Sequence, residues 1–408
     1  MNGGHLDEGA LLRDRPTAEL SKWRMRAVGL AVVGIAASAY GYTIDRQLFA
    51  QSYLIAFIFW TGITVGSLAL LMVQYLSGGG WGLFARRVFE ASTRNLWLLA
   101  LLFIPIATHL PSLYPWARPD EVAANPDIQE KVAYLNPNFF YLRAAGFFVI
   151  WGALAFLLNR WSKEQDDNPI RPMGPKDGRM RVLSGPGLVL YMLTVTFMAV
   201  DWVMSLEPHF TSTIFGILTL GGQGLSTLAF TILVLAGLSH SRPVSEVAQP
   251  RLFHDLGKLM LALVMLWAYF SFSQFLIIWA GNLPEEIPYY LKRLDGGWKY
   301  LSLALAFGHF ILPFCLLLSA DLKKRPKLLA RVAWFIVAMR LYDTIWLVAP
   351  VFQPAGALPI SLANIGIPLA LAGAWLVLFA GQLGKLPLLP VNDPYFKQML
   401  ASPHQGGH

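Results

Sequence analysis

The stretch Asp201-Trp-Val-Met-Ser-Leu-Glu207-Pro-His209-Phe-Thr-Ser-Thr-Ile-Phe-Gly216 joins two long apolar segments and places a carboxylate inside the first of them. Asp201 lies past the middle of the apolar run 187–206, and Glu207 and His209 follow at its end. A carboxylate within a bilayer costs about 2.5–3.5 kcal/mol on insertion scales, so it usually faces a partner group, water or a substrate path. The stretch therefore predicts a membrane protein with a polar interior rather than a simple anchor.

The composition of the whole chain agrees with a membrane protein. The 408 residues are 55% hydrophobic and only 14% charged, with a mean hydropathy of +0.50, whereas a soluble domain carries about 25% charged residues. The net charge of +8 comes from basic residues in short loops between apolar runs, which suits membrane orientation better than nucleic-acid binding. The single cysteine, Cys315, excludes a disulfide, a CxxC zinc site and cysteine-ligated iron–sulfur clusters within this chain.

Ten apolar segments are long enough, or nearly so, to cross about 30 Å of hydrocarbon. The third is the shortest and contains Pro105. The sequence thus predicts an all-α integral membrane protein of about ten transmembrane helices. They are expected near 26–43, 49–76, 95–111, 139–159, 187–206, 213–237, 257–280, 299–319, 329–350 and 360–382.

The lysines and arginines predict the orientation of these helices. Most of the 32 basic residues fall in alternate loops, and we assign Arg86, Arg87 and Arg94 to one of these, between the second and third segments. By the positive-inside rule, such a bias predicts that both termini are cytoplasmic. It also favours an even number of helices.

The loops suggest how the chain is divided. A hydrophilic cytoplasmic linker, 160–186, would separate an N-terminal transmembrane part, 26–159, from a C-terminal part, 187–382. Helices two to five and six to nine would form two four-helix bundles, flanked by helices one and ten. Cytoplasmic segments are expected at 1–25 and 383–408, the latter ending in an unstructured tail from 391. The long outer loop 112–138 either docks against another subunit or is solvated.

Several ionisable side chains are predicted to lie deep in the membrane. His309 is near the centre of the eighth helix, and Arg340 and Asp343 are near the centre of the ninth, on one helical face where they can pair. In one interpretation, Asp201, His309 and Asp343 accept and release protons along a path. The charge of Arg340 would make the pKa values of these three groups differ. In the other, the pair of Arg340 and Asp343 only fixes helix packing.

A second polar group is predicted near the outer membrane surface, where a base would serve a proton exit or a quinol head group. For any one of these residues taken alone, the favoured interpretation is an interfacial side chain wetted by headgroups and a partner protein. Gln274, in the outer half of the seventh helix, either lines a wet channel or bonds a helix neighbour, and Gln223 lies on a small-residue face of the sixth. The outer group comprises Asp45, His109, Glu207, His209, Glu285 and Glu286.

No resident cofactor or metal is expected on this chain. A bis-histidine haem needs two histidines at matched depth, and only His309 is predicted to lie deep. The glycine cluster Ser77-Gly-Gly-Gly-Trp81 lacks the lysine and the spacing of a nucleotide-binding loop.

Three blocks of the sequence resemble a known family. They are Asp201-Trp-Val-Met-Ser-Leu-Glu-Pro-His-Phe210, Phe272-Ser-Gln-Phe-Leu-Ile-Ile-Trp-Ala-Gly-Asn-Leu-Pro-Glu-Glu286 and Arg340-Leu-Tyr-Asp-Thr-Ile-Trp-Leu-Val-Ala-Pro350. The chain is similar to the ten-helix membrane subunits of bacterial alternative complex III, in the polysulfide-reductase membrane-subunit (NrfD-like) family. It looks more like the ActF type than the quinol-site-bearing ActC type.

The resemblance implies a subunit of a quinol:electron-acceptor oxidoreductase in the bacterial cytoplasmic membrane. It implies that quinol, iron–sulfur clusters and haem c are bound by partner subunits: a second ten-helix NrfD-like subunit, an iron–sulfur subunit, a multihaem cytochrome c subunit and other membrane subunits. It leaves the quinone-binding residues, if any, unspecified on this chain. The matching blocks contain Asp201, His209, Gln274, Glu285, Glu286, Arg340 and Asp343, whereas His309 lies outside them.

The predicted function is therefore a cofactor-free membrane subunit that provides a scaffold and a proton path. The alternatives are a stand-alone proton-coupled transporter, for which broken helices at the midplane are expected, and a purely structural subunit with inert ion pairs. The proton-path hypothesis comprises Asp201, Glu207, His209, Gln274, His309, Arg340 and Asp343.

Overall fold

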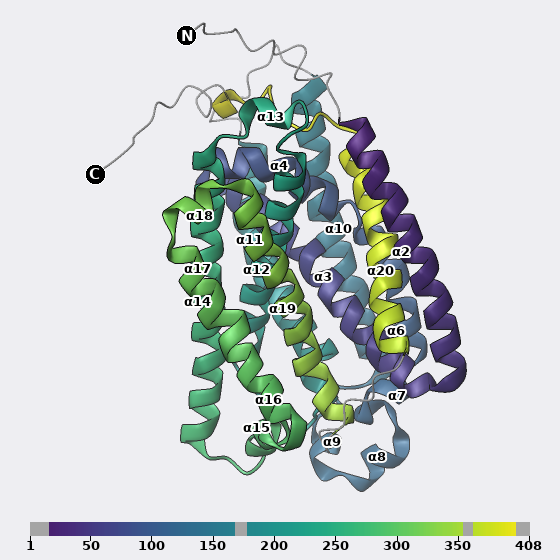
Figure 1. The fold of residues 1–408 in the computed structure, drawn as a ribbon. Helices are drawn as coiled ribbons and strands as arrows, with labels where there is room; N and C mark the ends of the chain where they lie inside the picture. The colour runs from purple at the N-terminus through teal and green to yellow at the C-terminus, as the bar shows by residue number, and fades with distance from the viewer. Residues whose placement is uncertain (1–15, 168–177, 354–361, 397–408) are drawn as a thin grey trace, which may run out of the picture.

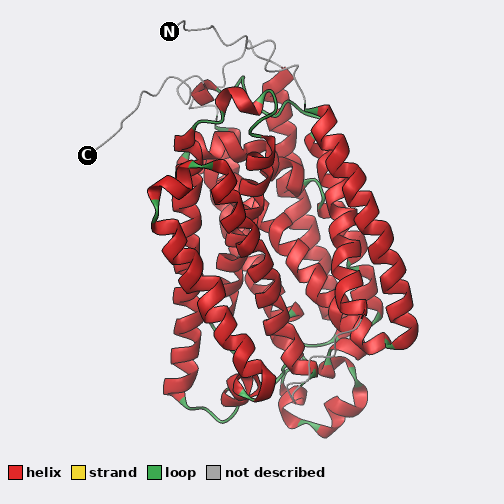
Figure 2. Ribbon diagram, in the orientation of Figure 1, coloured by secondary structure: helices red, strands yellow, loops and turns green. Residues whose placement is uncertain are grey.

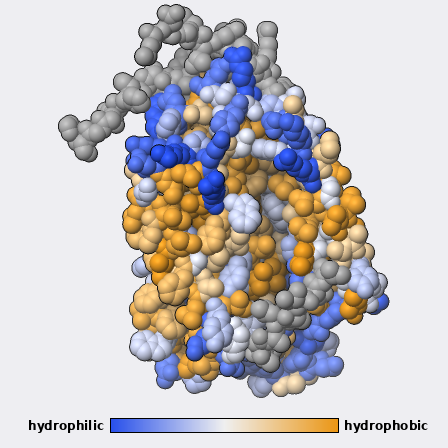
Figure 3. All heavy atoms as spheres, viewed as in Figure 1, coloured by the Kyte–Doolittle hydropathy of each residue, from blue (hydrophilic) through white to orange (hydrophobic). Residues whose placement is uncertain are grey.

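The computed structural model describes residues 16–167, 178–353 and 362–396. These described residues form helices, turns and loops without a strand (Figure 2). Ten of their helical segments are long and apolar enough to cross a membrane. Apolar side chains cover the middle of the visible face, and hydrophilic side chains gather toward its two ends (Figure 3). The prediction of an all-α, multi-pass membrane fold is confirmed.

The ten candidate spans follow one another along the chain with short helices at their ends. Three of them combine consecutive helices: the third is α4 to α6, the fifth is α11 with η2, and the eighth is α16, η3 and α17. The spans are α2 (Thr17–Ile44), α3 (Arg46–Ser77), α4 (Gly80–Thr93) with α5 (Leu96–Leu102) and α6 (Ile104–Thr108), α10 (Pro137–Asp167), α11 (Arg179–Trp202) with η2 (Met204–Leu206), α12 (Phe215–Leu238), α14 (Pro250–Gly281), α16 (Gly296–Ala304) with η3 (Leu305–Ile311) and α17 (Leu312–Leu318), α19 (Pro326–Phe352) and α20 (Leu362–Leu383). The shorter helices are α7 (Leu110–Leu113), η1 (Pro115–Ala117), α8 (Pro119–Ala124), α9 (Pro126–Glu130), α13 (Val244–Val247), α15 (Ile287–Leu294) and α18 (Ala320–Lys324).

Local sequence explains where several spans begin and end. Asp45 caps α3, because its carboxylate accepts hydrogen bonds from the backbone N–H groups of Gln47 and Leu48, both at 2.9 Å. Pro250 and Pro326 stand at the first positions of α14 and α19, where proline's missing N–H costs nothing. Asn282 ends α14 in the left-handed conformation with φ of 49°. Asp45, expected in the outer polar group, is thus a capping residue.

The spans pack as two groups that meet along α3 and α12. α3 is almost entirely buried and contacts α4 and α11 of the first group, while α12 contacts α14 and α19 of the second. At their crossing, the hydroxyl of Thr227 donates to the carbonyl oxygen of Ile63 at 3.0 Å. α2 and α20 lie side by side at the flank of the molecule (Figure 1). This arrangement agrees with two four-helix bundles and two flanking helices.

The third span differs from its prediction. It begins at Gly80 rather than at 95, so the assignment of Arg86, Arg87 and Arg94 to a loop is wrong. Arg86 and Arg87 lie on α4 and are buried, and Arg94 is its C-cap residue. Carboxylates from α4, α10 and the C-terminal segment neutralise Arg86 and Arg87, which lets a charged helix enter a span that hydropathy alone rejects.

The segment after α20 also differs in part. Residues 391–396 pack against the helices, with Asp393 and Phe396 buried, so they are not a free tail. The rest of that tail, the predicted N-terminal segment as far as residue 15, and 168–177 of the linker lie outside the described residues. The start of α2 and the end of α20 lie at the same end of the molecule, as an even number of spans requires (Figure 1).

Candidate functional site

Arg340 and Asp343 form a buried ion pair on α19. The Nη1 group of Arg340 donates to the carboxylate of Asp343, and its Nε donates to the hydroxyl of Ser226 on α12 at 3.2 Å. Gly222, one turn earlier on α12, makes room for the guanidinium, because a Cβ there would lie 2.2 Å from Arg340 Nη2. The predicted pairing is confirmed, and the small-residue face of α12 is what admits the charged side chain.

Trp267 on α14 joins this pair to His309. Its indole N–H donates to Asp343 at 3.3 Å, and its ring lies 3.8 Å from the imidazole ring, centroid to centroid. His309 is 1% exposed, and neither of its ring nitrogens has a hydrogen-bond partner among the described residues. It lies in the π-helical segment η3, a departure from regular helix that is frequent at functional sites.

A small cavity of about 40 Å³ borders the ion pair. Its lining includes Arg340, Asp343 and Ser226, together with Gln223, whose side-chain oxygen accepts from the Tyr191 hydroxyl at 2.9 Å. A polar cavity of this size holds at least one water with several partners. We call Ser226, Trp267, His309, Arg340 and Asp343 the interior cluster.

Asp201 is not a member of the interior cluster. It is fully buried, but its Oδ2 accepts from Arg143 Nε of α10 at 2.7 Å, and Arg143 in turn lies over the ring of Tyr134. The other carboxylate oxygen of Asp201 has no partner among the described residues. The three residues predicted to form a proton path therefore lie in two groups. His309 and Asp343 are together, and Asp201 is with Arg143.

Glu207 forms a third group at the end of the fifth span. Its two carboxylate oxygens accept from Lys292 at 3.0 Å and from Arg293 at 3.1 Å, both on α15. Arg293 is fully buried, lies 3.5 Å from the centre of the Tyr289 ring, and donates to the carbonyl oxygen of Leu347 at 2.8 Å. Because Leu347 also lines the cavity beside Asp343, the Glu207 group adjoins the interior cluster.

Tyr289 is a buried hydroxyl that the sequence did not single out. Its Oη has no partner among the described residues, and it lies within electrostatic reach of Arg293, Glu207 and Asp343. Burial raises the pKa of Tyr289 to about 12, so the hydroxyl keeps its proton at neutral pH. The hydroxyl is therefore close to both the Glu207 group and the interior cluster.

The remaining predicted residues lie at the periphery. His209 is half-exposed and tethers the outer loop, with Nδ1 2.7 Å from Asp127 and Nε2 3.0 Å from Asn125. Gln274 is buried, accepts weakly from Ser212 at 3.4 Å and borders a pocket of about 260 Å³ with Glu286.

Two further members of the predicted outer group are also accounted for. Glu285 lines a separate pocket of about 460 Å³ that Glu207 shares. The Nδ1 atom of His109 lies 2.9 Å from the carbonyl oxygen of Pro105, within its own helical turn.

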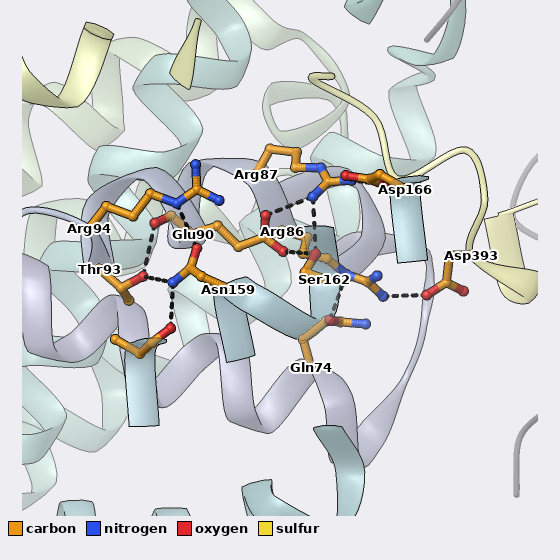
Figure 4. A network of polar contacts seen from close by, with 11 residues as sticks. Gln74, Arg86, Arg87, Glu90, Thr93, Arg94, Asn159, Ser162, Asp166 and Asp393 are labelled. Atoms are coloured by element: carbon orange, nitrogen blue, oxygen red, sulfur yellow. Dashed lines mark hydrogen bonds and ion pairs between the residues drawn. The ribbon is translucent and has the colours of Figure 1, made fainter. Parts of the chain in front are cut away.

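A buried ionic network around Arg86 and Arg87 was missed by the sequence analysis (Figure 4). Arg87 donates to Glu90 at 2.8 Å and to both oxygens of Asp166 on α10 at 2.6 and 2.7 Å, and Ser162 donates to Glu90 at 2.6 Å. Arg86 reaches Asp393 at 2.7 Å. The spacing of Arg87 and Glu90 was the available signal, but their partners are far away in sequence.

A comparison with protein-family models and with curated proteins finds no match to this chain. Among the described residues, no group of three histidine, cysteine, aspartate or glutamate side chains is placed to hold a metal ion. The chemistry that the interior cluster offers is proton exchange: a carboxylate and an arginine line a cavity with room for water, and an imidazole packs against Trp267, which donates to the carboxylate.

Proposed function

We propose that the chain is a membrane subunit of a quinol-oxidising electron-transfer complex of the alternative complex III type, and that it moves protons without binding a redox cofactor. The observation that carries the proton role is the interior cluster. In it His309 packs against Trp267 and lacks hydrogen-bond partners among the described residues, while Arg340 and Asp343 line a cavity. The family assignment rests on the three resembling sequence blocks.

The contacts support a path of two steps toward the end of the molecule that bears α15. The first runs from His309 to Asp343 and the cavity by way of water. Trp267 carries no proton, because its indole is a donor only; it packs against His309 and orients the Asp343 carboxylate. The second runs past Leu347 and the Tyr289 hydroxyl to Glu207, which borders open pockets of about 460 and 360 Å³. Asp201 and Arg143 form a separate buried pair, and we assign them to packing of α10 on α11.

The first test is a purification of the tagged chain from native membranes in mild detergent. We expect an iron–sulfur subunit, a multihaem cytochrome c and a second ten-helix subunit to co-purify, with quinol-oxidising activity. A lone, cofactor-free protein would refute the complex and favour a proton-coupled transporter, for which the π-helical interruption of the eighth span is the supporting feature.

The proton role is tested with Asp343→Asn in that complex. Asparagine keeps the shape and can still accept from Trp267, but it cannot carry a proton, so we expect proton release in proteoliposomes to fall about tenfold or more. The matched control is Asp321→Asn on α18, which is exposed. An assembled Asp343→Asn complex with undiminished proton release would leave the cluster a structural role only.

A further inference from the structure

A pocket of about 320 Å³ lies where four spans begin or end. Its wall includes the last turn of α3, the N-cap of α4 and Arg86 on that helix, Gln165 near the end of α10, the start of α11 and the segment around Asp393. The lining residues that matter here are Gln74, Gly78, Gly79, Arg86, Arg181 and Asp393. Neither the interior cluster nor the Glu207 group contributes to it.

Arg86, one of the lining residues, has a buried donor without a partner among the described residues. Its Nε donates to Gln74 at 3.1 Å and its Nη2 to Asp393 at 2.7 Å, but its Nη1 has no partner among the described residues (Figure 4). The side chain is only 2% exposed. A buried guanidinium N–H without a partner costs free energy, which an anion in the pocket would recover.

The start of α4 adds a second attraction for an anion. Gly79 is the N-cap of this 14-residue helix, so no side chain caps it, and its first turn contains no acidic residue. Gly78 and Gly79 have φ of 69° and 94°, which glycine adopts without strain, and nothing lies within 4 Å of a Cβ built at Gly78. The N-terminus of a helix carries a partial positive charge and free N–H groups that bind phosphate.

The net charge of the pocket is also positive. Among the described lining residues the one carboxylate, Asp393, is engaged by Arg86, and the exposed Arg181 at the start of α11 remains as a second cation. Because the pocket is formed by the ends of transmembrane helices, it lies at the depth of lipid headgroups. Basic pockets between transmembrane helices commonly bind anionic headgroups.

We infer that this pocket binds a phosphate group through Arg86, Arg181 and the N-terminus of α4, and that its position favours the headgroup of an anionic phospholipid. The glycine cluster at 78–80 lacks the lysine of a nucleotide-binding loop. In the site inferred here, Arg86 supplies the positive charge for the phosphate instead. This inference is independent of the proposed proton role.

The test uses the purified, delipidated full-length protein with its native partners. The midpoint of thermal unfolding is measured while phosphatidylglycerol, phosphatidylcholine or inorganic phosphate is added, and apparent dissociation constants are compared between variants. We expect phosphatidylglycerol to stabilise the protein and Arg181→Gln to weaken that binding about tenfold. The matched control is Arg325→Gln, an exposed arginine at the same end of the molecule but outside the pocket.

A second variant, Asp393→Asn, tests the role of Arg86 without removing the buried guanidinium. It releases Arg86 Nη2 from its carboxylate, so phosphatidylglycerol should bind more tightly, although the protein alone becomes less stable. Stabilisation by inorganic phosphate without phosphatidylglycerol would assign the site to a soluble phosphate compound. Equal effects of Arg181→Gln and Arg325→Gln, or lipid binding unchanged in both Arg181→Gln and Asp393→Asn, would overturn the site.

Discussion

At the scale of single residues, the absence of a side chain at Gly222 is as important to the interior cluster as the charges are. A methyl group at this position would lie 2.2 Å from Nη2 and 2.7 Å from Cζ of Arg340. Arg340 cannot move away freely, because Asp343 and Ser226 hold its other nitrogens. The small residue is therefore a requirement of the ion pair.

We expect Gly222→Ala to destabilise the protein by about 1–3 kcal/mol, since it overpacks a buried guanidinium. The control is Gly224→Ala on the same helix, where the new Cβ would lie 3.5 Å from Leu263, an ordinary contact. Because alanine is the better helix former, this control should stabilise by about 0.5–1 kcal/mol. Thermal unfolding of both variants in detergent measures the difference, and equal midpoints would contradict the account.

The sequence was informative about residues whose partners are near in the chain. Arg340 and Asp343 were predicted to pair because they are three residues apart on one helix. Asp201 was expected to be buried, but its partner Arg143 is 58 residues away, and depth estimates alone grouped Asp201 with the wrong residues. Which of several buried charges meet depends on helix packing, and hydropathy contains no information about it.

At the scale of elements, the pairing of α2 with α20 depends on glycine at the points of closest approach. A Cβ at Gly34 would lie 2.2 Å from the backbone nitrogen of Ala370, and one at Gly373 would lie 2.3 Å from that of Ala31. Backbone atoms cannot rotate away as side chains do. Small residues that allow such close contact are the usual means of helix association in membranes.

Gly34→Val should therefore separate α2 from α20 and lower the free energy of unfolding by about 1–3 kcal/mol. Gly29→Val is the matched control on the same helix, because nothing lies within 4 Å of a Cβ there. Both substitutions change helix propensity equally, so the difference between their unfolding midpoints reports packing alone. A similar loss in both variants would show that the contact is not required.

The positions of the membrane-spanning helices could be predicted from the sequence where hydropathy alone defines them. The other spans have apolar runs long enough for hydropathy to detect despite single charges such as Asp201 and Arg340, whereas the third begins with the charged helix α4 and was placed too late in the sequence. Its arginines are acceptable only because Glu90, Asp166 and Asp393 surround them. The π-helical η3 was also missed, since hydropathy does not report hydrogen-bond register.

At the scale of the whole molecule, the charges at its two ends still predict its orientation. The corrected position of α4 removes Arg86 and Arg87 from the count of loop charges, because both are paired inside the protein. The end that bears α18 keeps a run of exposed basic residues, including Lys324 and Arg325, whereas the opposite end, with α8 and α9, carries Asp120 and other exposed acids (Figure 1). By the positive-inside rule, this difference predicts that the α18 end is cytoplasmic.

Cysteine labelling in intact cells tests this orientation. Cys315 is exposed, so it is first replaced in a Cys315→Ser background, and single cysteines are introduced by Asp120→Cys on α8 and Lys324→Cys on α18. A membrane-impermeant maleimide should label the first variant in intact cells and the second only after permeabilisation, since the two positions lie at opposite ends of the spans. The reverse pattern would invert the orientation and turn the Glu207 end of the proposed proton path toward the cytoplasm. Equal labelling of both would contradict the membrane-spanning arrangement itself.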